Sequence, residues 1–169
     1  RLRHARRIVR ACQAAFTPER NDVCLLLKSS NGHMYPDAMR SLLKEVAVDP
    51  RITLRDEVID KAHIHALQRC CDAYVSLHRA EGFGLGMAEC MALGKPVIAT
   101  GWSGNLEFMD AANSCLVEYD LVPVAGDYPE SEGALWAEPR IASAAEAVRR
   151  LADDPAYARQ LGGAGKRDI

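Results

Sequence analysis

Several features are missing from this chain of 169 residues, and each absence excludes a class of protein. No apolar run approaches the ~18 residues that a membrane-spanning helix needs. Aromatic residues make up only 6 % of the chain and the net charge is −2, so we expect no nucleic-acid partner. The arginine-rich start lacks the apolar segment of a signal peptide, and we therefore expect a cytoplasmic protein.

Signatures of metal sites and disulfides are also missing. The six cysteines form no CxxC pair, and the five histidines complete no zinc-binding spacing. Several cysteines lie within apolar runs, which is typical of reduced thiols in a core. We accordingly predict neither a metal site nor a bound cofactor.

What the chain does contain is a regular alternation of strand-like and helix-like segments, without internal repeats. This alternation predicts one three-layer α/β domain over residues 1–169, with a mainly parallel sheet. Helices are expected over 2–16, 36–48, 61–71, 85–93, 103–109 and 141–152, and from 156 to an end at Gly162; strands are expected at 23–27, 52–58, 73–77, 96–99 and 115–117. Residues 119–139 are expected to form a long functional or mobile loop.

A glycine-rich turn is the centre of the predicted site. Gly82, Gly84 and Gly86 follow the strand at 73–77, and a helical pattern begins at Leu85. Glycines let the backbone approach a ligand closely, and the start of a helix offers unpaired N–H groups. A pyrophosphate fits such a turn, although a structural turn with nothing bound would have the same sequence.

Two glutamates bracket this turn. Glu81 stands at its mouth, where a carboxylate can accept hydrogen bonds from hydroxyls, and Glu89 lies about one turn into the helix, within reach of a ribose. The alternative is that Glu81 merely favours the helix dipole and that Glu89 is a solvated surface residue.

Two further positions could face an anion. Lys28 follows the apolar strand at 23–27, and ligands of open α/β sheets collect at the carboxyl ends of strands, although an ordinary edge lysine fits equally well. Ser103 and Gly104 open a second short helix, whose start could face phosphate or sugar.

The run EGFGLGMAECMALGKPVIAT, at residues 81–100, resembles the donor-site signature of a known family. These are the retaining nucleotide-sugar glycosyltransferases with two Rossmann-like domains (GT-B fold) of the glycosyl transferase group 1 family. The runs SGNLEFM, NSCLVEYDLVPV and WAEP resemble a branch often found in bacterial polysaccharide synthesis, and the resemblance covers residues 23–152.

The resemblance implies that this chain is the carboxyl-terminal, donor-binding half of such an enzyme. The amino-terminal acceptor domain is absent, the opening strand of the sheet is not found, and the chain alone is expected to be inactive. The implied reaction is metal-independent transfer of a sugar, with retention, from a nucleotide diphosphate to an acceptor hydroxyl. The implied catalytic residues are Glu81 and Lys28, and the implied donor-binding residues are Gly82, Phe83, Gly84, Leu85, Glu89, Ser103, Gly104 and, for the base, Val58.

The expected partners are a nucleotide-sugar donor and, through the absent domain, a glycan or lipid-linked acceptor. The resemblance also allows peripheral association of the full-length protein with the inner face of the membrane. Two alternatives remain open: a non-catalytic nucleotide-binding module, and another enzyme of the same fold, such as a nucleotide-sugar epimerase or a glycan phosphorylase.

Overall fold

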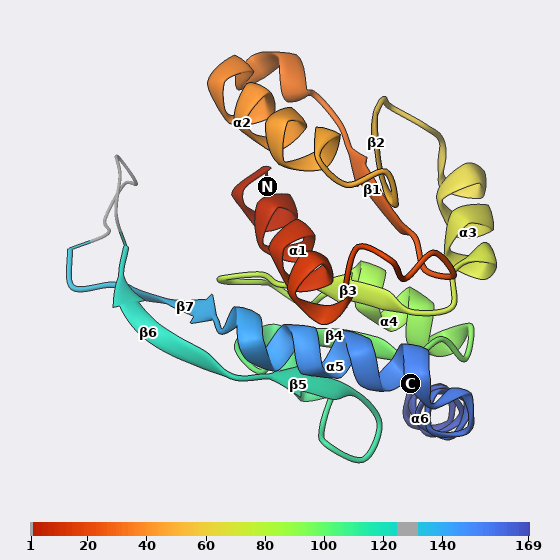
Figure 1. Ribbon diagram of the computed structural model, residues 1–169. Coiled ribbons are helices and arrows are strands. Elements are labelled where there is room, and N and C mark those ends of the chain that lie inside the picture. The colour runs from red at the N-terminus through yellow and green to blue at the C-terminus, as the bar shows by residue number, and fades with distance from the viewer. Residues whose placement is uncertain (1, 125–131) are drawn as a thin grey trace.

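Two parallel sheets and one hairpin form the strands of this α/β protein, whose computed structural model describes residues 2–124 and 132–169 (Figure 1). One parallel pair joins β1 (Leu25–Ser29) to β2 (Ile52–Asp56). The second sheet is also parallel, with the order β3 (Tyr74–Ser76), β4 (Val97–Thr100), β5 (Cys115–Val117). The hairpin consists of β6 (Tyr119–Pro123) and β7 (Leu135–Pro139).

Helices cover both faces of the β3–β4–β5 sheet. The α-helices of the described residues are α1 (Leu2–Ala15), α2 (Pro36–Ala47), α3 (Lys61–Cys70), α4 (Leu85–Ala92), α5 (Ile141–Asp153) and α6 (Pro155–Asp168). Helices α1, α4, α5 and α6 pack on the β3–β4–β5 sheet, whereas α2 packs on β1 and β2. Ile98 packs with buried residues of α1, α5 and α6, whereas its neighbours Val97 and Ala99 pack with α4. Because successive side chains of a strand point to opposite faces, α1 and α5 lie on one face and α4 on the other. The predicted α/β class and parallel pairing are therefore confirmed.

Helix α1 joins the two sheets. Its residue Val9 packs with Leu27 of β1, and Ala11 packs in the cluster of Leu77 and Ile98. Within the described residues β1 pairs only with β2, and β3 only with β4, so no backbone ladder runs from one sheet to the other.

The segment 119–139 was expected to be a loop, and this prediction is wrong. Strands β6 and β7 pair antiparallel from Tyr119 opposite Pro139 to Pro123 opposite Leu135. The prolines stand at the ends of the strands, where a missing N–H costs little. Residues 125–131, between the strands, lie outside the described part of the chain.

The predicted end of the last helix at Gly162 is also wrong, because α6 continues to Asp168. A Cβ at Gly162 would stand 2.2 Å from the carbonyl oxygen of Gly94, so this glycine permits a close helix–turn contact rather than ending the helix. The short helix expected at 103–109 is a 3-10 helix over Gly104–Glu107.

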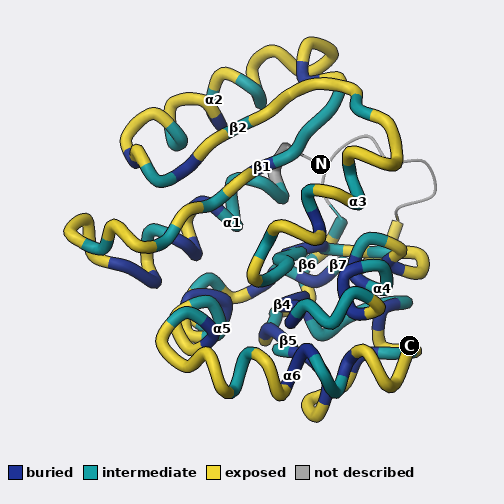
Figure 2. Tube along the Cα trace, turned by 90° about the vertical axis from the view of Figure 1, so that its right-hand side faces the viewer, coloured by how far each residue is buried: buried dark blue, intermediate teal, exposed yellow. Residues whose placement is uncertain are grey.

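Exposure differs between the two parts of the fold. Figure 2 shows mostly exposed backbone along α2 and β2, whereas buried residues gather around α4, β4 and β5. Cys12 and Cys90 are buried and Cys24 and Cys70 are exposed, and all six cysteines are free. In residues 2–124 and 132–169, no helix has both the length and the apolar character to cross a membrane.

Replacing Gly162 by alanine tests the close contact of α6. The added Cβ must displace the Gly94 peptide, and we expect the free energy of unfolding to fall by about 1–3 kcal/mol. The matched control is Gly163→Ala, where a Cβ meets only the end of Arg167 at 3.8 Å and alanine favours the helix by roughly 0.5–1 kcal/mol. Urea unfolding of both variants measures the difference, and equal stabilities would contradict this account of α6.

Candidate functional site

The turns that follow β3 and β4 lie against each other. Parallel neighbouring strands end at the same edge of a sheet, so the segments leaving them begin side by side. The Ser103 hydroxyl donates to the carbonyl oxygen of Glu81 at 2.7 Å, and the Gly104 N–H donates to the same oxygen at 3.3 Å. The Glu81 N–H in turn donates to Ser103 Oγ at 3.3 Å. The structure thus brings Glu81, Gly82, Ser103 and Gly104 together.

Backbone conformation explains the small residues at this contact. A Cβ at Gly104 would stand only 1.5 Å from the carbonyl oxygen of Gly82. Gly84 opens α4 with φ +93°, a region that favours glycine, and Ser103 has φ +84°, which is strained for a serine. No side chain caps α4 at Gly84, and the Met87 N–H donates to the carbonyl oxygen of Gly84. The Leu85 and Gly86 N–H groups of the first turn are therefore left without an acceptor in the helix.

The buried His78, which follows β3, forms hydrogen bonds with the segment that follows β4. His78 Nε2 lies 2.9 Å from the carbonyl oxygen of Trp102 and 3.0 Å from Asn105 Oδ1. Both partners accept hydrogen bonds, because one is a carbonyl oxygen and the other is the amide oxygen of Asn105, whose Nδ2 donates to the carbonyl oxygen of Thr100. The hydrogen of the imidazole ring therefore lies on Nε2. Sequence reasoning missed His78; its position directly after a buried strand was the available signal.

Glu89 is held by three side chains of α3. Gln68 Nε2 donates to Glu89 Oε2 at 3.1 Å, while His65 Nε2 and Lys61 Nζ lie 3.5 and 3.8 Å from Oε1. The hydrogen bond from Gln68 is the main cause that lowers the pKa of Glu89, opposed by burial. Glu89 is therefore not a freely solvated glutamate, and its side chain is 31 % exposed.

The spacing of these α3 residues was visible in the sequence, because Lys61, His65 and Gln68 stand four and three residues apart and share one helix face. His63 is exposed and pairs with Asp60, the cap of α3, but His65 is half-buried and faces Glu89.

Tyr74 is a phenol whose environment includes both glutamates. Its hydroxyl is covered by the start of α4, where a Cβ at Gly86 would stand 2.8 Å from it. Burial, with smaller contributions from neighbouring groups that include Glu81 and Glu89, raises the pKa of Tyr74 to about 12. Both carboxylates therefore contribute to the environment of this phenol.

Lys28 and Val58 lie on the other sheet. Lys28 Nζ donates to the carbonyl oxygens of Ser29 at 2.6 Å and Glu57 at 2.5 Å, so it caps the ends of β1 and β2. Val58 follows β2 and is 78 % exposed. In the described part of the chain, no hydrogen bond or ion pair joins Lys28 or Val58 to the glycine turn.

Apolar side chains cover the outer side of the glycine turn. Phe83 is half exposed and packs on Phe108 with ring centroids 5.0 Å apart, and Leu85 is exposed. Neither prominent hollow of the surface includes the turn. One hollow of about 500 Å³ lies at the start of α2, between Arg6, Tyr35 and Ser41 among others. The turn thus exposes apolar side chains and lines neither of these two hollows.

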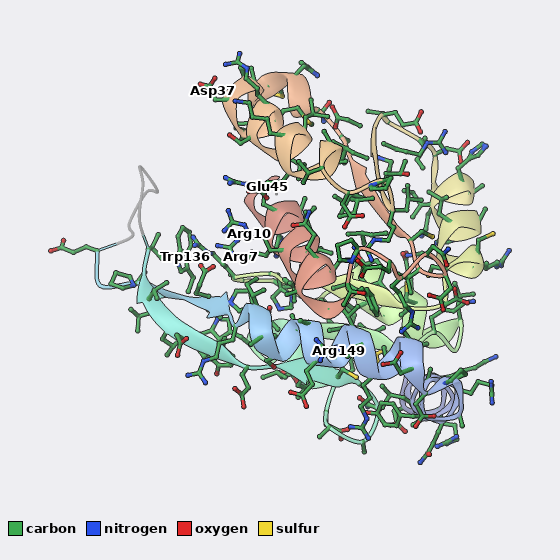
Figure 3. The ribbon with its side chains drawn as sticks, in the orientation of Figure 1. Arg7, Arg10, Asp37, Glu45, Trp136 and Arg149 are labelled. Carbon is green, nitrogen blue, oxygen red and sulfur yellow. The ribbon has the colours of Figure 1, made fainter. Side chains whose placement is uncertain are left out.

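The hairpin is anchored beside this surface. The Ala137 N–H donates to the carbonyl oxygen of Arg79, two residues before Glu81, at 3.0 Å. Arg7 of α1 makes a two-pronged ion pair with Glu138, which Arg79 also contacts, and Arg79 lies over the Trp136 ring. Figure 3 labels Arg7 on α1 and Trp136 on the hairpin. For residues 2–124 and 132–169, no group of three or more His, Cys, Asp or Glu could hold a metal ion.

Comparison with known proteins places these features in context. The model of the family described as Glycosyl transferases group 1 matches residues 3–154. A trehalose synthase of Rubrobacter xylanophilus is 26 % identical over 156 residues, which are 89 % of this chain and 32 % of that protein. The chain thus spans about a third of the length of this relative.

Solved structures share the fold. The Staphylococcus aureus protein TarM, solved in complex with fondaparinux, alpha-GlcNAc-glycerol and UDP, has a TM-score of 0.70 and 16 % identity; the match covers 97 % of this chain and 29 % of TarM. The carboxyl-terminal domain of a glycosyl transferase group 1 family protein from Francisella tularensis has a TM-score of 0.66 and 20 % identity, over 95 % of this chain and 74 % of that one.

Replacing Gln68 by methionine tests how Glu89 is held. Methionine fills the space without donating, so we expect the pKa of Glu89 to rise from its lowered value in the wild type. A carboxylate whose pKa is lowered by folding stabilises the fold at pH values above 4.5, which is its pKa in the unfolded chain. This contribution is lost as the pH falls through the pKa of the folded state. The variant should therefore be less stable than the wild type at pH 7, with the difference shrinking below pH 4.5.

A carbon-13 NMR titration of the Glu89 carboxyl measures the shift directly. The matched control is Arg69→Met, at the exposed neighbour of Gln68 on α3. An unchanged titration of Glu89 in Gln68→Met would show that the hydrogen bond does not tune this carboxylate.

Proposed function

We propose a function from the premise that the chain belongs to the family of glycosyl transferases group 1, whose model matches most of its length. In this proposal the chain binds a nucleotide-diphosphate sugar, and the protein of which it is a part transfers the sugar to an acceptor hydroxyl with retention at the anomeric carbon. The observation that carries the proposal is the junction of the two turns. It gathers a carboxylate, a hydroxyl and the uncapped start of α4 on one open surface.

The diphosphate is proposed to lie against the glycine turn. The backbone N–H groups of Phe83, Gly84 and Leu85 would donate to its oxygens, supported by the positive end of the α4 dipole, and Gly82 lets the backbone approach the ligand closely. Ser103 and Gly104 border the same surface, since both contact Glu81. Lys28 would reach the diphosphate by exchanging its present carbonyl partners for phosphate oxygens.

The sugar and the nucleoside have separate proposed contacts. Glu81 accepts a hydrogen bond from the Gly82 N–H at 3.1 Å and keeps lone pairs for hydroxyls of the donor sugar. Glu89, kept ionised by Gln68, would accept both hydroxyls of the ribose. The exposed Val58 would form part of the surface that meets the base.

Catalysis in this proposal comes from positioning and charge. Negative charge grows on the diphosphate as the sugar leaves, and fixed N–H dipoles together with the Lys28 ammonium would stabilise it without a metal ion. We assign no protein nucleophile. Retention is proposed from the resemblance of the EGFGLGMAE run alone.

The acceptor belongs to the part of the enzyme that this chain does not include, because the trehalose synthase relative is about three times as long. We propose a glycan or lipid-linked acceptor in polysaccharide synthesis, in the cytoplasm or at the inner face of the membrane. The 169 residues alone are proposed to bind the donor but to be inactive. UDP is the first nucleotide to test, because TarM was solved with it.

A non-catalytic nucleotide-binding module is the second candidate. It is favoured by the internal hydrogen bonds of Lys28 and Glu89, which a ligand would have to share or replace. Activity of the intact enzyme distinguishes the two candidates, since both require nucleotide binding by this chain.

Nucleotide binding is tested by the stability of the chain with UDP or GDP. A ligand of the native state should raise the free energy of unfolding by about 2.7 kcal/mol at a hundredfold excess over its Kd. Uridine without phosphates is the control, since it lacks the group that the turn is proposed to hold. Equal and negligible shifts with UDP, GDP and uridine would contradict both candidate functions.

Alanine substitutions of Glu81 and Glu89 should affect the kinetics of the intact enzyme differently. Glu81→Ala is expected to abolish most transfer, and Glu89→Ala is expected mainly to weaken donor binding, because one carboxylate meets the transferred sugar and the other meets the ribose. Glu107→Ala is the control, since Glu107 is an exposed glutamate of the turn after β4. Wild-type kinetics in both variants would refute the assignment.

A further inference from the structure

His78 is a buried polar side chain to which the proposed function gives no role. It lies just after the end of β3 and is 0 % exposed. Its Nδ1 lies 3.2 Å from Ser76 Oγ, and its Nε2 lies 2.9 Å from the carbonyl oxygen of Trp102 and 3.0 Å from Asn105 Oδ1. The imidazole ring therefore links the end of β3 to the segment that follows β4.

The hydrogen bonds of this ring fix the roles of its two nitrogens. Because Nε2 carries the ring hydrogen, it donates to the oxygens of Trp102 and Asn105, and Nδ1 is left to accept from the Ser76 hydroxyl. Asn105 is also 0 % exposed, and its Nδ2 donates to the carbonyl oxygen of Thr100. Loss of the Nε2 donor would take away the donor of a buried amide oxygen, which is unfavourable inside a protein.

The two residues held by Nε2 flank the strained part of the turn after β4. Ser103 and Gly104 lie between Trp102 and Asn105, and both donate to the carbonyl oxygen of Glu81. Ser103 has φ +84°, a conformation that serine adopts only when the surrounding contacts impose it. A single N–H that bonds on both sides of this pair therefore restrains the strained segment at each end.

We propose that His78 is a positioning residue of the donor site, whose Nε2–H holds Ser103 and Gly104 against the glycine turn. Its bearing on donor binding rests on the proposed function, whereas its effect on the turn does not. His78 acts through the backbone of the turn and touches no ligand in this proposal. Its ring is itself held in place, because His4 of α1 packs against it edge-on, with ring centroids 6.3 Å apart.

Two substitutions of similar length separate the hydrogen bond from the space that the ring fills. His78→Gln offers an N–H donor near the position of Nε2, whereas His78→Met fills the space without a donor. The Gly104 amide signal in a proton–nitrogen NMR spectrum reports the turn, because this N–H is bonded to Glu81, and calorimetry measures the Kd for UDP or GDP.

We expect His78→Gln to resemble the wild type in both measurements. His78→Met should shift the Gly104 signal and raise the Kd by about tenfold, as expected for one lost buried hydrogen bond. If His78→Met does not fold, His78→Asn takes its place, because its shorter side chain brings the amide to the level of Nδ1, on the side of Ser76. Leu161→Ala, in the buried core beneath α6, is the control for general destabilisation and should keep both the signal and the Kd.

Each remaining outcome has one meaning. The same Gly104 signal in His78→Gln and His78→Met would overturn the positioning role. A shifted signal with an unchanged Kd would overturn its bearing on the donor site. A wild-type chain that binds neither UDP nor GDP would refute the proposed function instead, and the Gly104 signals would still decide whether His78 positions the turn.

Discussion

The candidate site depends on the close approach of two backbone segments. The carbonyl oxygen of Glu81 accepts hydrogen bonds from Ser103 and Gly104, and no side chain larger than hydrogen fits at Gly104 against Gly82. These contacts hold the turns after β3 and β4 at a fixed separation in the absence of any ligand. N–H groups that are already in position need no reorganisation when negative charge develops beside them, which is the general advantage of such a rigid turn.

The packing of α1, and not a continuous sheet, fixes the position of this rigid turn relative to the rest of the proposed donor surface. Lys28 and Val58 belong to the β1–β2 pair, which shares no backbone hydrogen bond with β3 in the described residues. Val9 and Ala11 of α1 join the cores of the two sheets, and Arg7 of the same helix holds the hairpin through Glu138. The apolar face of α1 therefore sets how far Lys28 and Val58 lie from the glycine turn.

The polar groups of the site are largely satisfied within the protein. Glu89 is held from α3, Lys28 caps two strand ends, and His78 links Trp102 to Asn105. A ligand must share or replace some of these partners, which favours binding through the uncapped backbone of α4 first. Helix α3 belongs to the surroundings of the site, because it presents Gln68 to Glu89.

The sequence by itself determined the elements whose signals are local. Apolar runs and helical periodicity located most strands and helices, and the spacing of Glu81, Gly82, Gly84 and Glu89 identified the turn and the family. It failed where distant contacts decide: residues 119–139 pair as a hairpin, and α6 passes Gly162 because Gly94 packs there. Only the tertiary structure revealed His78 beneath the turns and the α3 face that holds Glu89. Periodicity records which residues are buried, whereas a hydrogen bond between residues 21 or 27 positions apart depends on how helices and strands pack.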